Sequence, residues 1–213
     1  NQGTNNNTIE YCDIHAGAST PNNAIYSYGL PASSTATKNI VIQYCNIYDF
    51  YSDGGTSRGI YLTNGTASWT IKNNSFYQTT PRYPASGATL MTVIEISDGS
   101  AYNHKIYDNF IGGSAPHLGG DSLFVIASAT QRIQFRGLYV YTASNSLNSI
   151  QGNRISRIRF EAYSNSYGAN LFRGIETSYG IYSIGDTTAN IIGGLSGNDS
   201  LIIMINGFQA CNI

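Results

Sequence analysis

The residues of this chain that could do chemistry are few and scattered. Only 11% of the 213 residues are Asp, Glu, Lys or Arg. The candidate catalytic groups are Lys72 or Arg58 as a base, with Glu95, Asp53 and His104 nearby if the repeats described below stack on one another. A polysaccharide lyase would need a base beside carboxylates that bind Ca²⁺, and a glycoside hydrolase would need carboxylates about 5 to 9.5 Å apart. Neither arrangement is evident, and solvated surface charge is the competing interpretation of all five residues.

Tyrosine and arginine residues recur in a pattern that suits binding. They are Tyr26, Tyr61 and Tyr139, flanked by Arg58, Arg136 and Arg173. Aromatic faces stack on sugar rings, and the rigid guanidinium fork donates hydrogen bonds to hydroxyls or carboxylates. The alternative is that the tyrosines pack against long loops and fill the face of a sheet. This column is therefore a candidate carbohydrate-binding surface.

A repeated signature must position these residues. It consists of an aliphatic residue or Phe, two variable residues, Cys or Asn, one variable residue, and Ile or Phe. The copies begin at Ile9, Ile42, Ile71, Ile106, Ile150 and Phe208. Their spacing is irregular, which is typical of a solenoid whose turns restore a core pattern but carry side loops of different lengths. The longest interval, after Ile155, is expected to hold one degenerate repeat.

A second register supports stacked strands. Four segments share a polar residue, a small residue, an aliphatic residue and a large outward group, and they begin at Asn23, Arg58, Arg136 and Arg173. Two registers per repeat predict two stacked strands per repeat. Around each signature the apolar residues alternate with a period of two, which indicates short strands, and amphipathic helices are almost absent. The predicted fold is all-β: a right-handed parallel β-helix of about seven coils, with long loops on one side.

The fourth place of the signature predicts a ladder through the stack. It is occupied by Cys12, Cys45, Asn74, Asn109, Asn153 and Cys211. Asn tolerates the left-handed conformation of a tight turn, and its amide can bond equivalent amides in neighbouring coils. Cys12 and Cys45 would lie one coil apart, roughly 4.8 Å, whereas disulfides prefer Cβ atoms about 3.8 Å apart. We therefore expect free, buried thiols.

Composition excludes several classes of function. The net charge of −1 gives no electrostatic footprint for nucleic acid. No stretch reaches the roughly 18 apolar residues of a membrane span, and no signal peptide is visible. The cysteine spacing fits no metal pattern, and His15 and His117 lie in loop-like sequence, so neither a metal nor a cofactor is expected. The chain stops at Ile213 inside its own repeat without a cap, so residues 1–213 are expected to form a single β-helix segment of a longer protein.

The Ile-x-x-Asn-x-Ile signatures resemble those of the pectate-lyase-like superfamily, whose fold is the right-handed parallel β-helix. The stretch from Arg173 to Ser200, with its Ile-Gly, Asn-x-Ile-Gly and Gly elements, looks more specifically like repeats of large surface proteins exported by the type IX route in gliding bacteria. That resemblance implies O-glycosylation at Asp-Ser or Asp-Thr sites, here Ser122, Thr187 and Ser200. The adjacent aspartates and Gly-His-Gly turn of the glycosidase branch have no match in this sequence.

Three hypotheses for function remain open because fold does not determine function. The first is a secreted, non-catalytic extracellular or cell-surface module that serves as a rigid stalk or adhesin and contacts polysaccharide or surface glycan. The second is a polysaccharide lyase or glycoside hydrolase. The third is a filament subunit that stacks on itself, or on the rest of a longer chain, through its coil ends.

Overall fold

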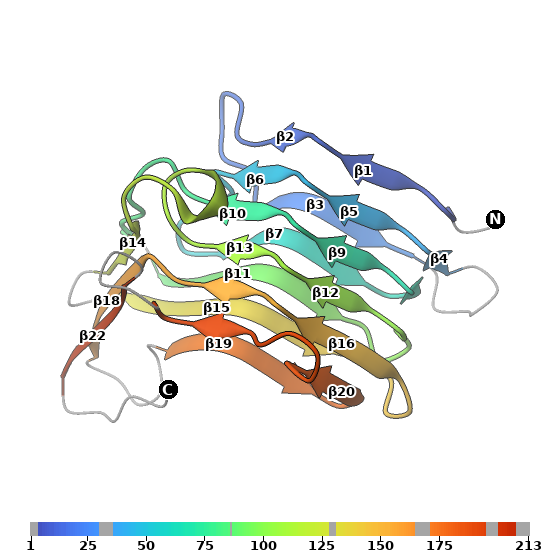
Figure 1. Cartoon of the computed structure of the whole chain (residues 1–213). Helices are drawn as coiled ribbons and strands as arrows, with labels where there is room; N and C mark the ends of the chain where they lie inside the picture. The colour runs from blue at the N-terminus through green and yellow to red at the C-terminus, as the bar shows by residue number, and fades with distance from the viewer. Residues whose placement is uncertain are drawn as a thin grey trace.

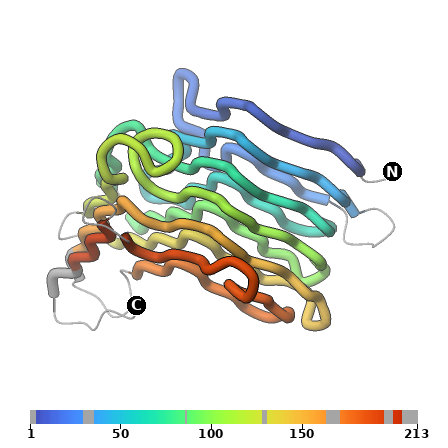
Figure 2. Tube along the Cα trace, in the orientation of Figure 1, coloured from blue at the N-terminus to red at the C-terminus, as the bar shows by residue number. Residues whose placement is uncertain are grey.

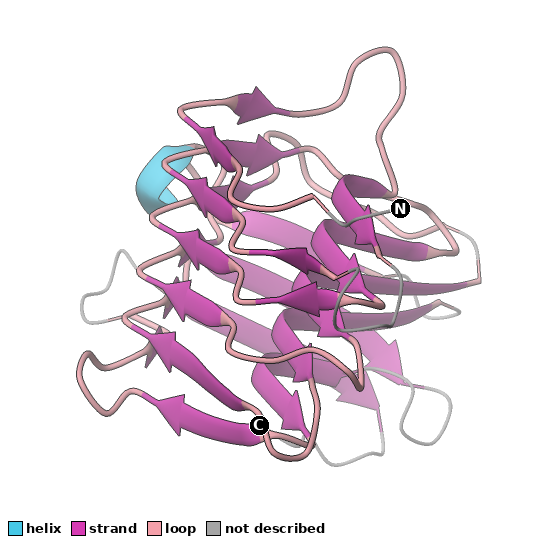
Figure 3. Ribbon diagram, turned by 90° about the vertical axis from the view of Figure 1, so that its right-hand side faces the viewer, coloured by secondary structure: helices cyan, strands magenta, loops and turns pink. Residues whose placement is uncertain are grey.

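The computed structural model describes residues 4–29, 36–85, 87–127, 131–164, 171–194 and 200–207. Its strands are short and stacked in rows, and the N-terminal and C-terminal parts lie at opposite ends of the stack (Figures 1 and 2). A single turn of 3-10 helix, η1 (Pro116–Leu118), interrupts the strands (Figure 3). Among the described residues, no helix is long and apolar enough to cross a membrane.

Three large sheets form the body of the molecule. The first contains β1 (Thr8–Glu10), β5 (Val41–Gln43), β9 (Thr70–Lys72), β12 (Lys105–Tyr107), β16 (Leu147–Gln151) and β20 (Ile181–Ile184). The second contains β2 (Asp13–Ile14), β6 (Asn46–Tyr48), β10 (Ser75–Tyr77), β13 (Phe110–Ile111), β17 (Arg154–Ile155) and β21 (Ile191–Ile192). The third contains β3 (Asn23–Tyr28), β7 (Thr56–Thr63), β11 (Ala88–Ser97), β15 (Arg132–Tyr141) and β19 (Leu171–Ser178).

Two smaller sheets complete the described structure. One contains β14 (Leu123–Ile126), β18 (Ile158–Ser164) and β22 (Leu201–Gly207), and the other pairs β4 (Thr37–Lys38) with β8 (Thr66–Ala67). Every pairing between these strands is parallel, and the chain visits the first, second and third sheets in that order in successive repeats, with the smaller sheets joined in some of them. We call the strands of one repeat a rung. The arrangement is all-β with parallel sheets, as predicted, and is consistent with a parallel β solenoid.

The signature sets the register of the first sheet. Ile42 pairs with Ile9 on one side and Ile71 on the other, and Ile106 pairs with Ile71 and Ile150. These side chains are almost completely buried, apart from Ile9 at the N-terminal end. Stacked isoleucines therefore fill the interior column by column, and removing this apolar surface from water is the main favourable contribution to folding.

The degenerate repeat expected after Ile155 is present. Ile184 pairs with Ile150 in the first sheet, and Ile192 pairs with Ile155 in the second. Asn190 takes the fourth place of the signature in this rung, because its Oδ1 accepts a hydrogen bond from the Asn153 backbone N–H at 3.0 Å. The copy that begins at Phe208 lies outside the described residues.

The predicted amide ladder is confirmed for the buried asparagines. Nδ2 of Asn74 donates to Oδ1 of Asn109 at 3.1 Å, and Nδ2 of Asn109 donates to Oδ1 of Asn153 at 2.9 Å. Nδ2 of each residue also donates to a signature isoleucine carbonyl in the preceding rung, such as Ile71 O for Asn109. Each Oδ1 additionally accepts the backbone N–H of the ladder residue before it. Buried peptide groups at this corner thus obtain the partners that buried polar groups require.

The expected backbone conformation of the ladder residues was wrong. The left-handed residue is the one before each of them, at the third place: Tyr11, Tyr44, Asn73, Asp108 and Gly152, with φ between 53° and 64°. The turn is therefore made one residue earlier, which leaves the fourth side chain free to point inward and bond its neighbours.

The cysteine prediction was correct for pairing and partly wrong for burial. Cys12 and Cys45 are both free thiols, but Cys12 is exposed and only Cys45 is buried. Cys45 Sγ lies 3.7 Å from Ile9 O, where the asparagines of later rungs place Nδ2. Burial raises the pKa of this thiol. Cys211 lies outside the described residues.

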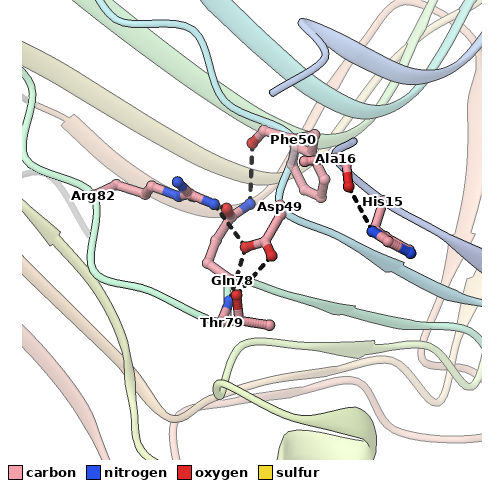
Figure 4. Close-up of polar contacts among 7 residues, drawn as sticks. All are labelled: His15, Ala16, Asp49, Phe50, Gln78, Thr79 and Arg82. Atoms are coloured by element: carbon pink, nitrogen blue, oxygen red, sulfur yellow. Dashed lines mark hydrogen bonds and ion pairs between the residues drawn. The ribbon is translucent and has the colours of Figure 1, made fainter. Parts of the chain in front are cut away.

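A polar cluster fixes the connection between β10 and β11 (Figure 4). Asp49 accepts hydrogen bonds from the backbone N–H and the hydroxyl of Thr79, and it forms an ion pair with Arg82 at 2.6 Å. Gln78 links this cluster to the chain by donating to Phe50 O at 3.0 Å and accepting from Arg82 Nε at 2.7 Å. The connection is therefore attached to the rung before it, and it leads into the strand that carries Glu95.

Candidate functional site

The outer face of the third sheet brings the predicted tyrosines and arginines together. We call this set the Arg–Tyr–Glu row, and its members are Arg58, Tyr61, Glu95, Arg136, Tyr139, Arg173 and Glu176. The register is the predicted one: Arg136 pairs with Arg173, and Tyr61 pairs with Tyr26. The rung between β7 and β15 was not predicted to share this pattern: Thr92 takes the arginine place and Glu95 the tyrosine place.

A bend in the strands of the third sheet places the first and the fourth residue of the repeated four-residue segment, such as Arg58 and Tyr61, on the same face. Residues three apart in a regular strand lie on opposite faces. In β7, however, the two residues between Arg58 and Tyr61 are both buried, whereas Arg58 and Tyr61 themselves are partly exposed. Consequently Arg58 lies over the ring of Tyr61 in β7, with its Cζ 4.0 Å from the ring centroid.

Glycine is required at the bends of β7, β15 and β19 because the space beside it is occupied, whereas Val93 takes the same place in β11. A Cβ added to Gly59 would lie 2.7 Å from Val93 O, and one added to Gly137 would lie 2.5 Å from Gly174 O. A Cβ on Gly174 would meet Ile192 at 2.6 Å. The small residue of the Arg-Gly-Ile-Tyr pattern is thus a packing requirement that holds the arginines and tyrosines in place.

The charged groups of the row are mutually paired. Glu95 accepts from Arg58 Nε at 2.7 Å and from Nη2 at 3.4 Å, and the Glu95 side chain is only 8% exposed. Glu176 Oε2 lies 3.0 Å from Arg136 Nε and 3.3 Å from Arg173 Nη1. Such pairs orient the guanidinium planes and neutralise the carboxylates, as partly buried charges require.

The three predicted tyrosines have different surroundings. Tyr26 is 54% exposed, and its ring stacks on Tyr61 with centroids 5.4 Å apart. Tyr139 lies beneath Arg136, with the guanidinium carbon 4.9 Å from its ring centroid, and burial raises its pKa. Tyr28, which was not among the predicted tyrosines, is 63% exposed on the same edge strand, β3. Within the strands of the third sheet, the exposed aromatic rings are therefore those of β3.

The structure brings only two of the five weak catalytic candidates into contact. Arg58 and Glu95 form the ion pair described above, whereas Lys72 belongs to β9 in the first sheet. Asp53 accepts from Ala85 N–H at 2.9 Å in the connection before β7. His104 is buried just before β12, and its Nδ1 accepts from Trp69 N–H at 3.4 Å.

The row does place two carboxylates on one face. Glu95 pairs with Tyr139, and Tyr139 pairs with Glu176, so the two acids lie two strand spacings apart. That is about 9.6 Å between their Cα atoms, at ~4.8 Å per strand. Glu176 was noticed in the sequence only as the outward residue of the fourth segment; the register, which adds Glu95 to the same column, identifies it as an acid of the site.

His104 gives a pH-dependent prediction. Burial lowers its pKa from 6.5 to about 4, while Asp98 opposes that change. The unfolded chain binds this proton near pH 6.5 and the folded chain does so only near pH 4, so stability falls as the pH falls through this window. The expected loss is about 3 kcal/mol between pH 6.5 and 4.

Urea unfolding of the wild-type chain and the His104→Asn variant from pH 7 to 4.5 measures this contribution. Asparagine is a suitable replacement because Asn148 occupies the next position in the same column. We expect the stability difference between the two proteins to shrink with falling pH, while His15→Gln, at an exposed site, retains the wild-type dependence. Curves for the wild type and His104→Asn that stay parallel over this range would show that the buried imidazole is not responsible.

The candidate glycosylation sites differ in accessibility. Thr187 is exposed in the connection between β20 and β21, whereas Ser122 and Ser200 are half-buried immediately before β14 and β22. Among the described residues, no group of three or more His, Cys, Asp or Glu side chains is placed to hold a metal ion.

Comparison of the chain with known protein families, curated proteins and solved structures finds no match.

Proposed function

We propose that this chain is a segment of a secreted, right-handed parallel β-helix of about seven coils that serves as a rigid, non-catalytic stalk or adhesin at the cell surface and contacts glycan. Its resemblance to the pectate-lyase-like fold and to type IX surface proteins of gliding bacteria supports this proposal. The observation that supports it most directly is the pair of exposed tyrosines on β3, Tyr26 and Tyr28. They lie beside the Arg–Tyr–Glu row, whose carboxylates and guanidinium groups are already paired with one another.

Several features suit a binding surface of this kind. Tyr26 stacks on Tyr61, which in turn contacts Arg58, so the exposed ring rests on a fixed support. Rigid aromatic rings contribute contact area to an interface at low cost in conformational entropy. The ion pair between Arg58 and Glu95 holds that support while leaving the Tyr26 ring accessible.

The test is a glycan-binding screen followed by a double substitution. Replacing Tyr26 and Tyr28 with alanine is expected to weaken binding of the selected glycan at least tenfold, because stacking on both rings is lost. Tyr83→Ala is the matched control, since Tyr83 is 60% exposed but lies in the connection after β10. Equal affinities for the double variant and the wild type would contradict a binding role for β3.

A second candidate is a glycoside hydrolase, favoured by the separation of Glu95 and Glu176. The Cα separation of about 9.6 Å is close to the upper limit for the carboxyl groups of inverting enzymes. The test is an assay for the release of reducing ends from a panel of polysaccharides. Activity in the wild type that is lost in both Glu95→Gln and Glu176→Gln would replace the non-catalytic proposal with this one.

A further inference from the structure

A groove on the outer face of the first sheet has not been used by either candidate function. Its volume is about 640 Å³. The floor is one column of paired residues from successive rungs: Val41, Thr70, Lys105, Ser149 and Ser183. The column runs across β5, β9, β12, β16 and β20, which lie one beneath the other (Figure 1). Four strand spacings make it about 19 Å long, and it belongs to a different sheet from the Arg–Tyr–Glu row.

The groove is lined mostly by uncharged groups that form hydrogen bonds. Besides the floor, Asn39, Ser68 and Asn103 line one side. Leu147, which is 57% exposed, and Tyr107 add apolar surface. Hydroxyl and amide groups interspersed with accessible apolar surface match the alternation of polar edges and apolar faces in a sugar chain.

One positive charge stands in the middle of this lining. Lys105 is exposed, and within the described part of the chain its ammonium forms no ion pair or hydrogen bond. The other basic group among the described residues of the lining is His104, whose imidazole is buried and neutral at pH 7. No carboxylate is among the described residues of the lining, so nothing there neutralises Lys105.

We propose that this groove binds an extended oligosaccharide that carries isolated anionic groups, one of which pairs with the Lys105 ammonium. The length of about 19 Å accommodates about four sugar units at ~5 Å each. A single lysine among neutral donors and acceptors favours a glycan with alternating charged and neutral sugars over one charged at every unit. The anionic group is a carboxylate or a sulfate, since an ammonium pairs with either.

Isothermal titration calorimetry at low salt with four hexasaccharide probes tests the proposal. Unsulfated chondroitin supplies only carboxylates, keratan sulfate supplies only sulfates, polygalacturonate is charged at every sugar, and a cello-oligosaccharide is neutral. We expect chondroitin or keratan sulfate to bind, and to bind more tightly than polygalacturonate and the neutral probe. Binding of neither alternating probe, or equal affinity for the neutral one, would overturn the proposal.

Substitutions locate the binding. Lys105→Ala is expected to weaken the preferred probe at least tenfold, and Lys105→Arg is expected to retain most of the affinity. Lys72→Ala is the matched control, because Lys72 pairs with Tyr107 on the same face but does not line the groove. If Lys72→Ala weakens binding as much as Lys105→Ala, the effect is general surface charge and the groove is not the site.

This site is distinct from the tyrosines of β3. The variant lacking Tyr26 and Tyr28 is therefore expected to bind the anionic probe normally, and Lys105→Ala is expected to leave the interaction with those tyrosines unchanged. Failure of one proposal would be distinguishable from failure of the other in the same set of proteins.

Discussion

Replacing Asn109 with alanine is expected to lower the free energy of unfolding by about 3 to 5 kcal/mol, because two buried backbone groups lose their partners. Asn109 Nδ2 donates to Ile71 O at 2.9 Å, and its Oδ1 accepts from the Asn74 backbone N–H at 3.1 Å. The site is fully buried, so water cannot replace either bond. Urea unfolding followed by circular dichroism measures the change.

Asn46→Ala is the control for this substitution. Asn46 is the first residue of β6 in the second sheet, and its side-chain amide donates a hydrogen bond to Asp13 at the surface. A change below about 1 kcal/mol is expected there, since water can satisfy the groups left behind. If Asn109→Ala were no more destabilising than Asn46→Ala, the ladder would not contribute to the free energy of unfolding beyond an ordinary surface hydrogen bond.

Gly137→Ala is expected to destabilise the chain by about 3 kcal/mol or to prevent folding, because the new methyl group has no space. Its Cβ would lie 2.5 Å from Gly174 O and 2.7 Å from Ile155 Cδ1. The first of these contacts is with backbone in the adjacent strand, which cannot rotate away as a side chain can. Thermal unfolding and the yield of soluble protein report the effect.

Gly17→Ala provides the comparison, since a Cβ at Gly17 meets nothing within 4 Å. That variant should unfold within a few degrees of the wild type. A small effect at Gly137 would mean that β15 tolerates a side chain at its bend as β11 tolerates Val93, and that contact with Gly174 O does not limit this position.

The sequence predicted the register well because the signature is an energetic requirement in each rung. Isoleucines that fill one interior column must recur at equivalent positions, so the pairs from Ile9 to Ile150 could be aligned without a structure. The repeat expected after Ile155 could not be placed at Ile184 from the sequence, because extra residues separate this isoleucine from Asn190. Those residues lie in an exposed connection, where insertion does not disturb the column.

The candidate site was predicted less completely for a related reason. The tyrosine column was found through repeated Arg-Gly-aliphatic-Tyr segments, but β11 fulfils the same positions with Thr92, Val93, Ile94 and Glu95. Side chains on an outer face are not fixed by interior packing, so their identities change from rung to rung. The floor of the groove at Lys105 consists of the residues just before the signature isoleucines, so their adjacency follows from the predicted register. The groove was missed because the small polar residues of its lining carry no sign of a binding role in the sequence.

The two faces also respond differently to their surroundings. On the third sheet, Glu95 and Glu176 each have an arginine within ion-pair distance. On the first sheet, Lys105 has no such partner within the described part of the chain. Added salt should therefore screen ligand binding at the groove more strongly than binding at Tyr26 and Tyr28, since exposed unpaired charge interacts through water.

The asparagine ladder also gives the interior a dipole along the axis of the stack. Asn74, Asn109 and Asn153 each donate one side-chain N–H to the amide oxygen of the ladder residue in the next rung, which for Asn153 is Asn190. The amide dipoles are thus aligned head to tail through the stack, and each polarises the next. The molecule consequently has unlike ends along its axis, with partial positive charge toward the C-terminal rungs and partial negative charge toward the N-terminal ones.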